Sequence, residues 1–248
     1  MKNKEFIAYG IHPISEALTE GKPIEKVLIQ KGLKGDAGYE VVHALRKAEV
    51  PIQYVPKAKL DRITGKNHQG MIAFISPIEY QNIEWLLPTI FEKGETPLIL
   101  VLDGVTDVRN FGAICRTAEC AGVHAVVIPT KGSAQIGPDA IKTSAGSLLR
   151  LPICRSMNLH ETLRFLKTSG LKVVACHEKA EITYTEADLT SPAVIIMGSE
   201  ESGIQIENLA TSTDQLRIPL AGRSSSLNVS TATGIILFEI LRQRTVMD

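Results

Sequence analysis

The sequence lacks a net charge of either sign, because 27 Lys and Arg balance 27 Asp and Glu among its 248 residues. No overall positive field indicates a nucleic-acid partner, so any RNA-binding surface has to be local. The part before Tyr80 has 12 basic and 9 acidic residues, or +3, and the rest has 15 and 18, or −3. Charge therefore neither excludes RNA nor requires it.

Regular cysteine patterns and long apolar runs are also missing. The four cysteines form no Cys-x-x-Cys pair, which favours reduced thiols over a disulfide framework. The first five residues are charged, the apolar stretch after them is too short for a signal peptide, and no later run reaches the roughly 20 residues of a membrane span. We expect a soluble, cytoplasmic protein with no membrane partner.

Several catalytic motifs are absent as well. No Gly-x-Gly-x-x-Gly follows the first strand of the alternating pattern described below, which disfavours a dinucleotide-dependent oxidoreductase. The segment from Gly198 to Gly203 lacks the Gly-x-Ser-x-Gly spacing of a serine hydrolase. The six histidines never stand at i, i+4, and the Cys176-His177 pair lacks further zinc ligands, so we expect no metal.

Helix and strand patterns alternate over the first 75 residues or so. The periodicity predicts an α/β domain with helices at 14–18, 39–48 and 60–64 and strands at 27–30, 52–55 and 71–75. Residues 79–96 follow as a linker with a helix, ended by a turn before Pro97. We therefore place domains at 1–78 and 97–248.

The second domain repeats short apolar runs between helical segments. The runs lie at 98–102, 125–128, 171–175, 194–197 and 216–219. Continuous β-branched runs alternating with helices are typical of a buried parallel sheet. Residues 227–244 read as a long final helix whose basic end suits the helix dipole.

Three polar clusters follow strand ends in this domain, at residues 102–118, 195–204 and 218–230. Open parallel sheets keep their ligands at such ends. Gly198 would let a ligand approach the backbone closely, and the serines at 224–226 offer a cap to the final helix. Each cluster alone is more typical of ordinary turns, helix caps and surface charges than of a functional site.

Together the clusters resemble the motifs of the SpoU or TrmH family, RNA ribose 2′-O-methyltransferases of the SPOUT class. The family's first motif is matched by Asn110, Gly112 and Arg116-Thr117-Ala118, and its second by Gly198 and Glu200. The third, Ile-Pro-x-x-Gly followed by Ser-Leu-Asn-Val-Ser, is matched from Ile218 to Ser230. The similarity covers nearly the whole chain and includes Tyr9 to Pro13 and His68 to Met71. These resemble the accessory domain, similar to ribosomal protein L30e, of the family's 23S rRNA guanosine methyltransferases.

The resemblance implies a catalytic set and a cofactor pocket for S-adenosyl-L-methionine. The catalytic positions are matched by Asn110, Arg116, Glu200, Ser226 and Asn228. The cofactor positions are matched by Met197, Gly198, Ile218, Leu220 and Leu227. One position departs from the family, because Val108 stands where proline is usual; we expect a slightly different loop with activity retained.

The family proposal makes the arginine, here Arg116, the general base, although a free guanidinium holds its proton near neutrality. Either Arg116 gives up its proton in the site, or it stays charged and stabilises a developing alkoxide. Asn110, Asn228 and Glu200 suit orienting Arg116, the nucleotide or the loops, and Ser226 suits contacting the arginine or a phosphate. The pattern leaves these alternatives open.

The resemblance further implies a trefoil knot, which pattern alone would not predict, and a homodimer through the last helix of the catalytic domain. The apolar stripe from Val229 to Leu241 suits that interface and equally suits packing within one domain. The implied substrate is 23S rRNA, at a guanosine, in preference to tRNA. A tRNA guanosine 2′-O-methyltransferase and a non-catalytic RNA-binding protein are the alternatives; for the latter, Lys57, Lys59, Arg62 and Lys66 suit phosphate contacts.

Overall fold

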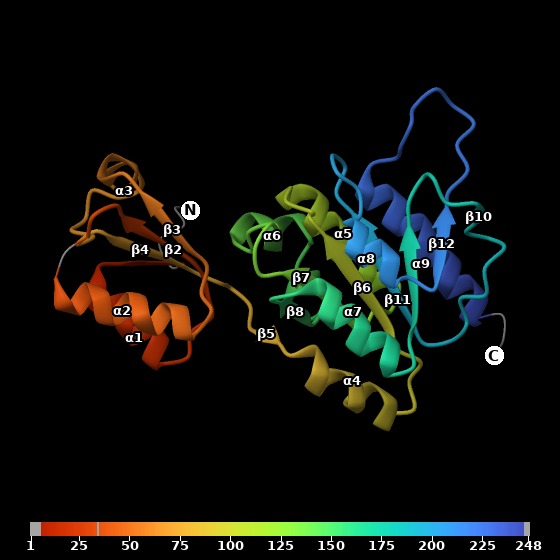
Figure 1. Cartoon of the computed structure of the whole chain (residues 1–248), viewed down its shortest axis with the longest axis horizontal. Helices are drawn as coiled ribbons and strands as arrows, with labels where there is room; N and C mark the ends of the chain where they lie inside the picture. Colours follow the sequence, from red (N-terminus) through yellow and green to blue (C-terminus); the bar gives the residue numbers. More distant parts are fainter. Residues whose placement is uncertain (1–5, 34, 246–248) are drawn as a thin grey trace. The chain divides into compact units, whose positions relative to one another are not determined.

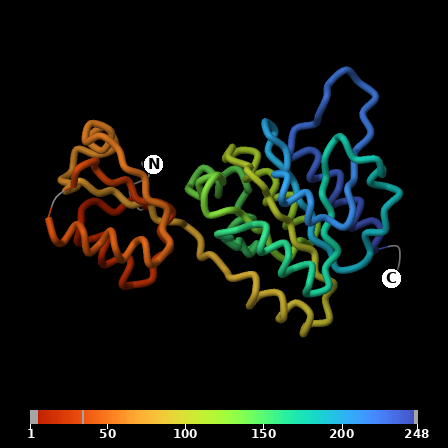
Figure 2. The backbone as a smooth tube through the Cα atoms, in the orientation of Figure 1, coloured from red at the N-terminus to blue at the C-terminus, as the bar shows by residue number. Residues whose placement is uncertain are grey.

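The computed structural model describes residues 6–33 and 35–245, which divide into two compact units. The first unit runs to Glu79 and includes residues 135–138, and the second comprises residues 80–134 and 139 onward. Figure 1 labels their helices and strands, and Figure 2 traces the backbone. Within the described residues no helix is long and apolar enough to cross a membrane.

The first unit is a sheet between helices. Its described part holds a four-stranded sheet in the order β1-β4-β2-β3, in which β4 runs antiparallel to both neighbours and β2 pairs parallel with β3. The elements are β1 (Ile7–Tyr9), α1 (Ile11–Thr19), β2 (Ile24–Gln30), α2 (Asp36–Lys47), β3 (Ile52–Val55), α3 (Lys57–Ile63) and β4 (Met71–Ile75).

Alternating side chains of β2 divide the core of this unit between the two faces of its sheet. Val27 and Ile29 pack with Ile14 of α1 and Leu45 of α2. Leu28, between them in sequence, packs with Leu60 of α3 on the other face. Successive residues of a strand point to opposite faces, so a single apolar run supports helices on both sides.

The second unit is built on a larger sheet. Among the described residues it has eight strands in the order β10-β12-β9-β11-β6-β7-β8-β5, and every neighbouring pair is parallel. The strands are β5 (Tyr80–Gln81), β6 (Leu98–Asp103), β7 (Ala125–Pro129), β8 (Ile153–Ser156), β9 (Lys172–Cys176), β10 (Ile182–Thr183), β11 (Ala193–Gly198) and β12 (Asp214–Arg217).

Helices cover both faces of this sheet. The core on one face joins α4 (Ile83–Glu92) and α7 (Leu159–Thr168) to Ile99 and Val101 of β6. On the other face α5 (Val108–Cys120) packs against α9 (Val229–Thr245), which also contacts β11. The remaining helices are α6 (Pro138–Thr143), a 3₁₀ turn at Ser147–Leu149 and α8 (Ile206–Thr211). This is a three-layer α/β arrangement with a parallel sheet, as the sequence predicted.

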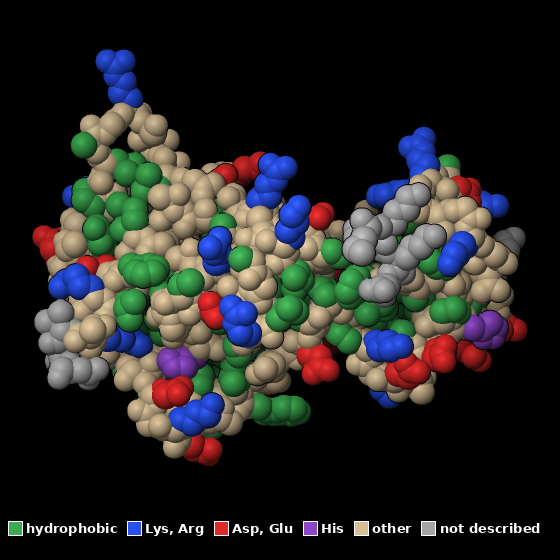
Figure 3. Space-filling view, turned by 180° about the vertical axis from the view of Figure 1, so that it is seen from behind, with side chains coloured by type: hydrophobic (Ala, Val, Ile, Leu, Met, Phe, Trp, Pro, Cys, Tyr) green, Lys and Arg blue, Asp and Glu red, His purple; other side chains and the backbone are tan. Residues whose placement is uncertain are grey.

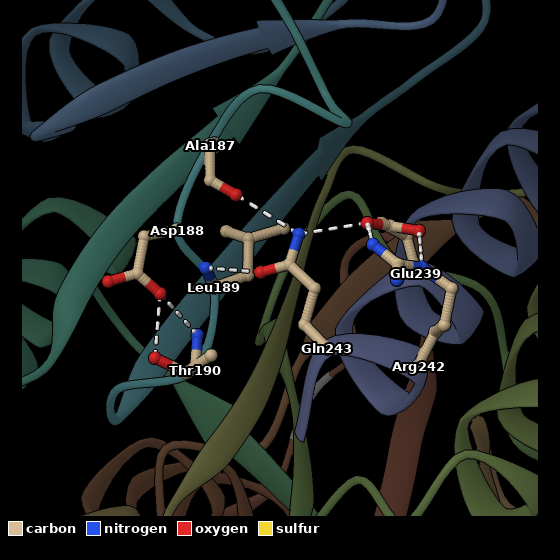
Figure 4. Close-up of polar contacts among 7 residues, drawn as sticks. All are labelled: Ala187, Asp188, Leu189, Thr190, Glu239, Arg242 and Gln243. Atoms are coloured by element: carbon tan, nitrogen blue, oxygen red, sulfur yellow. Dashed lines mark hydrogen bonds and ion pairs between the residues drawn. The ribbon is translucent and has the colours of Figure 1, made fainter. Parts of the chain in front are cut away.

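A polar cluster fixes the last turns of α9 (Figure 4). Arg242 donates to both carboxylate oxygens of Glu239, at 2.7 and 2.8 Å, and these bonds lower the pKa of Glu239 to about 2. Gln243 accepts from the amide of Leu189 and donates to the carbonyl of Ala187. Arg244 donates to four backbone carbonyls, those of Thr96, Pro97, Leu189 and Ser191. The C-terminal end of α9 is thereby tied to the segments that enter β6 and β11.

The predicted elements appear with small shifts of their ends, and two features differ from expectation. The segment expected as a linker contains the predicted helix as α4, but its Ile83, Leu87 and Ile90 are buried in the core of the second unit, and the segment also contains the unpredicted strand β5, which pairs with β8. The short strands β1 and β8 were not predicted, because three or four residues give too little alternation to stand out.

Candidate active site

A pocket of about 380 Å³ opens in the second unit where β9, β11 and β12 end. β11 pairs with β6 in the sheet, and the register places Gly198 beside Asp103. In the sequence, Gly198 and the start of α5, the helix that follows β6, are 90 residues apart. The pocket thus lies at the carboxyl ends of the parallel strands, the side on which open α/β sheets bind ligands. The lining includes Met197, Gly198, Glu200, Leu216, Ile218, Leu220, Ser226 and Leu227.

The first motif forms the start of α5. Asp107 caps the helix, because its carboxylate accepts from the backbone amides of Arg109 and Asn110 at 2.9 and 2.8 Å. Val108 is the first helical residue, where proline is favoured because its fixed φ suits the helix and its missing N–H is not needed. The Asp107 cap starts the helix at Val108 without a proline.

Gly112 in this motif allows a close approach of two segments. A Cβ atom there would lie 2.5 Å from the Cβ of Thr143 and 3.1 Å from the amide nitrogen of Ser144. The end of α6 therefore packs directly on the α5 backbone, and glycine is required by packing.

The second motif is a tight loop between β11 and α8. Ser199 and Gly203 exchange backbone hydrogen bonds at 3.1 and 3.0 Å, so the loop turns back on its own start. A Cβ on Gly198 would lie 2.2 Å from the carbonyl carbon of Gly203 and 2.4 Å from the nitrogen of Ile204. Gly198 was expected to let a ligand approach the backbone closely. In the structure, its missing side chain makes room for residues 203 and 204 of its own loop.

Asp103 holds the far side of this loop. Its carboxylate, 1% exposed, accepts from the backbone amide of Gln205 at 2.8 Å, from its side-chain amide at 3.1 Å and from Asn208 at 2.9 Å. Such a buried acceptor is costly to remove, because each donor left unpaired loses its compensation for desolvation. Asp103 therefore anchors the start of α8 to the end of β6.

We expect Asp103→Ala to lower both thermal stability and the affinity of the pocket for its ligand. Three donors would lose their acceptor, at about 1–3 kcal/mol for each buried group left unsatisfied. Asp103→Asn keeps the shape and part of the accepting capacity and should have a smaller effect. Thermal unfolding and ligand titration measure both, with Asp188→Ala as the control, because Asp188 is exposed and its carboxylate accepts from Thr190 alone among the described residues. Unchanged ligand affinity in folded Asp103→Ala would refute the anchoring role.

The third motif joins the other two. Asn228 caps α9: its side-chain oxygen accepts from the backbone amides of Ser230 and Thr231 at 2.9 and 3.4 Å. The cap expected from the serines at 224–226 is therefore supplied by Asn228. Its amide nitrogen donates to Glu200 at 2.6 Å and to Asn110 at 3.0 Å.

Glu200 is the common acceptor of the three motifs. One of its oxygens accepts from Asn110 at 3.2 Å, from Asn228 at 2.6 Å and from the backbone amide of Val229 at 3.3 Å. The carboxylate thus lies at the N-terminal end of α9, where the helix dipole favours negative charge. Segments 90 and 118 residues apart are joined at one point.

The structure brings most of the expected site residues together. All five expected cofactor positions line the pocket, as do Glu200 and Ser226. Asn110 and Asn228 stand outside the lining but bond to Glu200. Arg116 is exposed on α5, six residues beyond Asn110, and within residues 6–33 and 35–245 it makes no hydrogen bond or ion pair. Its guanidinium is therefore available to a ligand.

Sequence reasoning missed one wall of the pocket. Residues 176–179, after β9, contribute to the lining, and so does Ala232 of α9. Burial raises the pKa of the Cys176 thiol to about 12, so this cysteine stays protonated at neutral pH and is no nucleophile. His177 bonds through Nε2 to Gln215 of β12 at 3.0 Å. The only available indication was position, at the end of a predicted strand.

The three loops all lie in a segment that matches a family of RNA methyltransferases. Residues 97–238 match the SpoU rRNA methylase family, and residues 7–81 match the substrate-binding domain of RNA 2′-O ribose methyltransferases. The chain belongs to the SpoU rRNA methylase family.

Its curated relatives are of nearly equal length. The 23S rRNA (guanosine-2′-O-)-methyltransferase RlmB of Photorhabdus laumondii is 40% identical over 243 residues, covering 96% of this chain and 98% of the relative. RlmB of Escherichia coli K12 is 38% identical over 241 residues, with the same shares. An AdoMet-bound rRNA methyltransferase from Sinorhizobium meliloti has a similar structure, with a TM-score of 0.62 and 27% identity, covering 96% of this chain and 87% of that one.

Proposed function

We propose that this protein transfers a methyl group from S-adenosyl-L-methionine to the ribose 2′-hydroxyl of a guanosine in 23S rRNA. The observation that carries the proposal is the convergence of three family motifs on Glu200, beside a pocket lined by all the expected cofactor positions. The RlmB relatives support the substrate, because their similarity extends over both units.

The pocket residues fit the cofactor. Its volume of about 380 Å³ lies in the range of small-molecule sites. Met197, Ile218, Leu220 and Leu227 provide apolar walls for an adenosine, and the backbone after Gly198 offers polar groups for hydrogen bonds. When bound, S-adenosylmethionine supplies a methyl group activated by positively charged sulfur, and S-adenosylhomocysteine would remain as the leaving product.

The chain's own residues have separable roles in this reaction. Glu200, held by Asn110 and Asn228, fixes the geometry of the loops around the reacting atoms. Arg116, exposed and unpaired in the described chain, stabilises negative charge on the ribose oxygen as the hydroxyl proton passes to solvent water. Ser226, at the pocket rim, contacts the RNA or Arg116. Of the two roles open to Arg116, electrostatic stabilisation is the one we propose.

The two parts of the chain divide the work in this proposal. Residues 1–78, as an L30e-like domain, bind the RNA, residues 79–96 connect, and residues 97–248 carry the reaction. A match to a substrate-binding domain over residues 7–81 supports the first assignment. The protein would then act in the cytoplasm, where ribosomal RNA is assembled into ribosomes.

We further infer a homodimer through α9 and a trefoil knot in the catalytic domain. Phe238 and Leu241 of α9 are 49% and 37% exposed, which supports an apolar interface along this helix. Arg116 lies on α5, which packs against α9, so a partner subunit there would stand close to it. The knot follows from family membership and stays a prediction.

Methylation of purified RNA tests the proposal. The full chain is incubated with S-adenosylmethionine carrying a labelled methyl group and with unmodified 23S rRNA or tRNA, and the 2′-O-methyl positions are mapped. We expect one guanosine of 23S rRNA to be methylated and tRNA to remain unlabelled. Labelling of tRNA alone would overturn the substrate. If calorimetry detects no affinity for S-adenosylmethionine, with or without RNA, the proposal of a methyltransferase is overturned.

A further inference from the structure

The first unit contains a second hollow, of about 470 Å³, between the end of β2, α3 and the loop that leads into β4. Every residue of its lining is charged, polar or glycine. Pockets for drug-like molecules are lined mostly by apolar side chains, and protein interfaces have apolar centres. This hollow therefore suits a strongly polar ligand.

Its charge is positive. Lys57 and Lys66 stand in the lining, and Asp61 is the one acidic residue there. Residues 57–66 contain four basic residues, because Lys59 and Arg62 belong to the same segment, and Asp61 is the one acidic residue among them. Figure 3 shows several Lys and Arg side chains in the region of α3. A local excess of this kind attracts phosphate.

The aspartate is already engaged. His68 is 6% exposed, and its Nδ1 accepts from the backbone amide of Gly70 at 3.0 Å. Nε2 therefore carries the proton and donates to the Asp61 carboxylate at 2.9 Å. His68 engages Oδ1 of Asp61, and among the described residues this carboxylate forms no ion pair with either lysine of the lining. The Lys66 ammonium lies over the ring of Tyr9, 5.3 Å from its centroid, a contact that leaves its N–H donors free for an anion. The other lysine of the lining makes no such contact among the described residues.

The loop of residues 67–70, which forms one wall of the hollow, is held in one shape. Gln69 has a positive φ of 47°, and its side-chain oxygen accepts from the backbone amide of Ile11 at 3.1 Å. Asn67 accepts from the amide of Gln69 at 3.3 Å. Gly70 follows with φ 79°, and a Cβ there would lie 2.6 Å from Leu33. A preformed wall of this kind costs little ordering on binding.

Of the three side-chain amides in the lining, those of Asn67 and Gln69 already use their oxygens as acceptors, and that of Gln30 uses neither group among the described residues. Gln30, at the end of β2, lies in the lining beside Gly70, and within the described chain its side-chain amide makes no hydrogen bond. A glutamine amide offers a donor and an acceptor together, the combination that pairs with the edge of a nucleobase. Two cations and one free amide in a polar hollow match a phosphate linked to a base.

We propose that this hollow binds one unpaired nucleotide of the RNA substrate, with a phosphate between Lys57 and Lys66 and the base edge at Gln30. The inference rests on the proposed function and adds the location and chemistry of substrate recognition in the first unit. An unpaired nucleotide is favoured because proteins read RNA sequence mainly at loops and bulges, where the base edges are free.

The test measures the affinity of the full chain for a 23S rRNA fragment that it methylates, at several salt concentrations. Lys57→Ala/Lys66→Ala should bind at least tenfold more weakly at low salt, and its slope of log affinity against log salt should be shallower by about 0.7 for each phosphate that the protein no longer neutralises. Lys57→Arg/Lys66→Arg should restore most of the affinity. The control is Lys22→Ala/Lys47→Ala, which removes the same charge from exposed positions of the same unit outside the hollow.

Gln30→Met separates base recognition from charge. It keeps the length of the side chain and removes both hydrogen-bonding groups, so affinity should fall while the salt slope stays at the wild-type value. In Lys57→Ala/Lys66→Ala and in Gln30→Met, affinity for S-adenosylmethionine and turnover at saturating RNA should be unchanged. Only the KM for RNA should rise.

The outcomes distinguish this inference from the proposed function. A wild-type protein that methylates no RNA contradicts the function itself. If the wild type methylates 23S rRNA and the double alanine variant binds it with unchanged affinity and salt slope, only the hollow is misassigned. If the double alanine variant binds bare RNA with unchanged affinity but binds a particle that contains ribosomal proteins more weakly, the hollow binds a protein partner. That result would overturn the proposal of nucleotide binding.

Discussion

We expect Arg116→Ala to lose nearly all methyl transfer and to leave affinity for S-adenosylmethionine unchanged. Arg116 is exposed and makes no hydrogen bond or ion pair within the described residues, so its removal breaks no interaction that holds the fold or the pocket. Removing one group that stabilises developing negative charge costs about 10²–10³ in turnover in well-studied enzymes. Single-turnover methylation of the RNA substrate and calorimetry with the cofactor measure the two effects separately.

Arg116→Lys distinguishes the two roles of this residue. Lysine keeps the charge with a different geometry, so a stabilising role predicts partial activity, whereas a guanidinium acting as base predicts a decrease as large as in Arg116→Ala. Arg164→Ala is the matched control: Arg164 lies on α7, on the opposite face of the sheet, and its pair with Glu161 is exposed. Normal turnover by Arg116→Ala would remove Arg116 from the mechanism.

Gly198→Ala lowers affinity for S-adenosylmethionine by at least tenfold. The new Cβ would lie 2.2 Å from the carbonyl carbon of Gly203 and 2.5 Å from its oxygen. These are backbone atoms, so the loop of residues 199–203 has to move, and it carries Glu200 and much of the pocket wall. Forcing an extra methyl into such a site typically costs about 1–3 kcal/mol.

Gly222→Ala is the control for this substitution. Gly222 lies in the loop between β12 and α9, which adjoins the pocket, and apart from its two chain neighbours no atom of the described residues stands within 4 Å of its Cβ position. Cofactor affinity and melting temperature should both stay at wild-type values in Gly222→Ala. Gly198→Ala should melt a few degrees lower, at about 2–4 °C per kcal/mol for a chain of this size. Wild-type cofactor affinity in folded Gly198→Ala would show that the loop tolerates the methyl group.

Local pattern was enough to predict the main strands and the layer arrangement. The run from Leu98 to Leu102 is continuous and apolar, and it forms β6, whose six residues are all buried. Val27 to Gln30 likewise lies in β2. Period and composition report burial directly, because a strand covered on both faces is made mostly of apolar side chains. The two-residue strands β5 and β10 carry no such pattern and were invisible.

The resemblance selected the site residues, while their contacts depended on strand order. Nothing near Asp103 in sequence indicates that Gln205 and Asn208, 102 and 105 residues away, are its partners. Those contacts exist because β11 pairs with β6 and brings Gly198 beside Asp103. Residues 176–179 were overlooked for the same reason: they join the pocket only because β9 lies next to β11.

The sequence by itself determined the α/β class, most of the elements and the motifs that identify the family, because each depends on residues close together in the chain. Only the tertiary structure decided that Glu200 accepts from Asn110 and Asn228, that Asp103 anchors α8, and that Gly198 serves the return of its own loop. Hydrogen bonds act over about 3 Å, so a contact between distant segments exists only once the sheet has set which strand ends are neighbours.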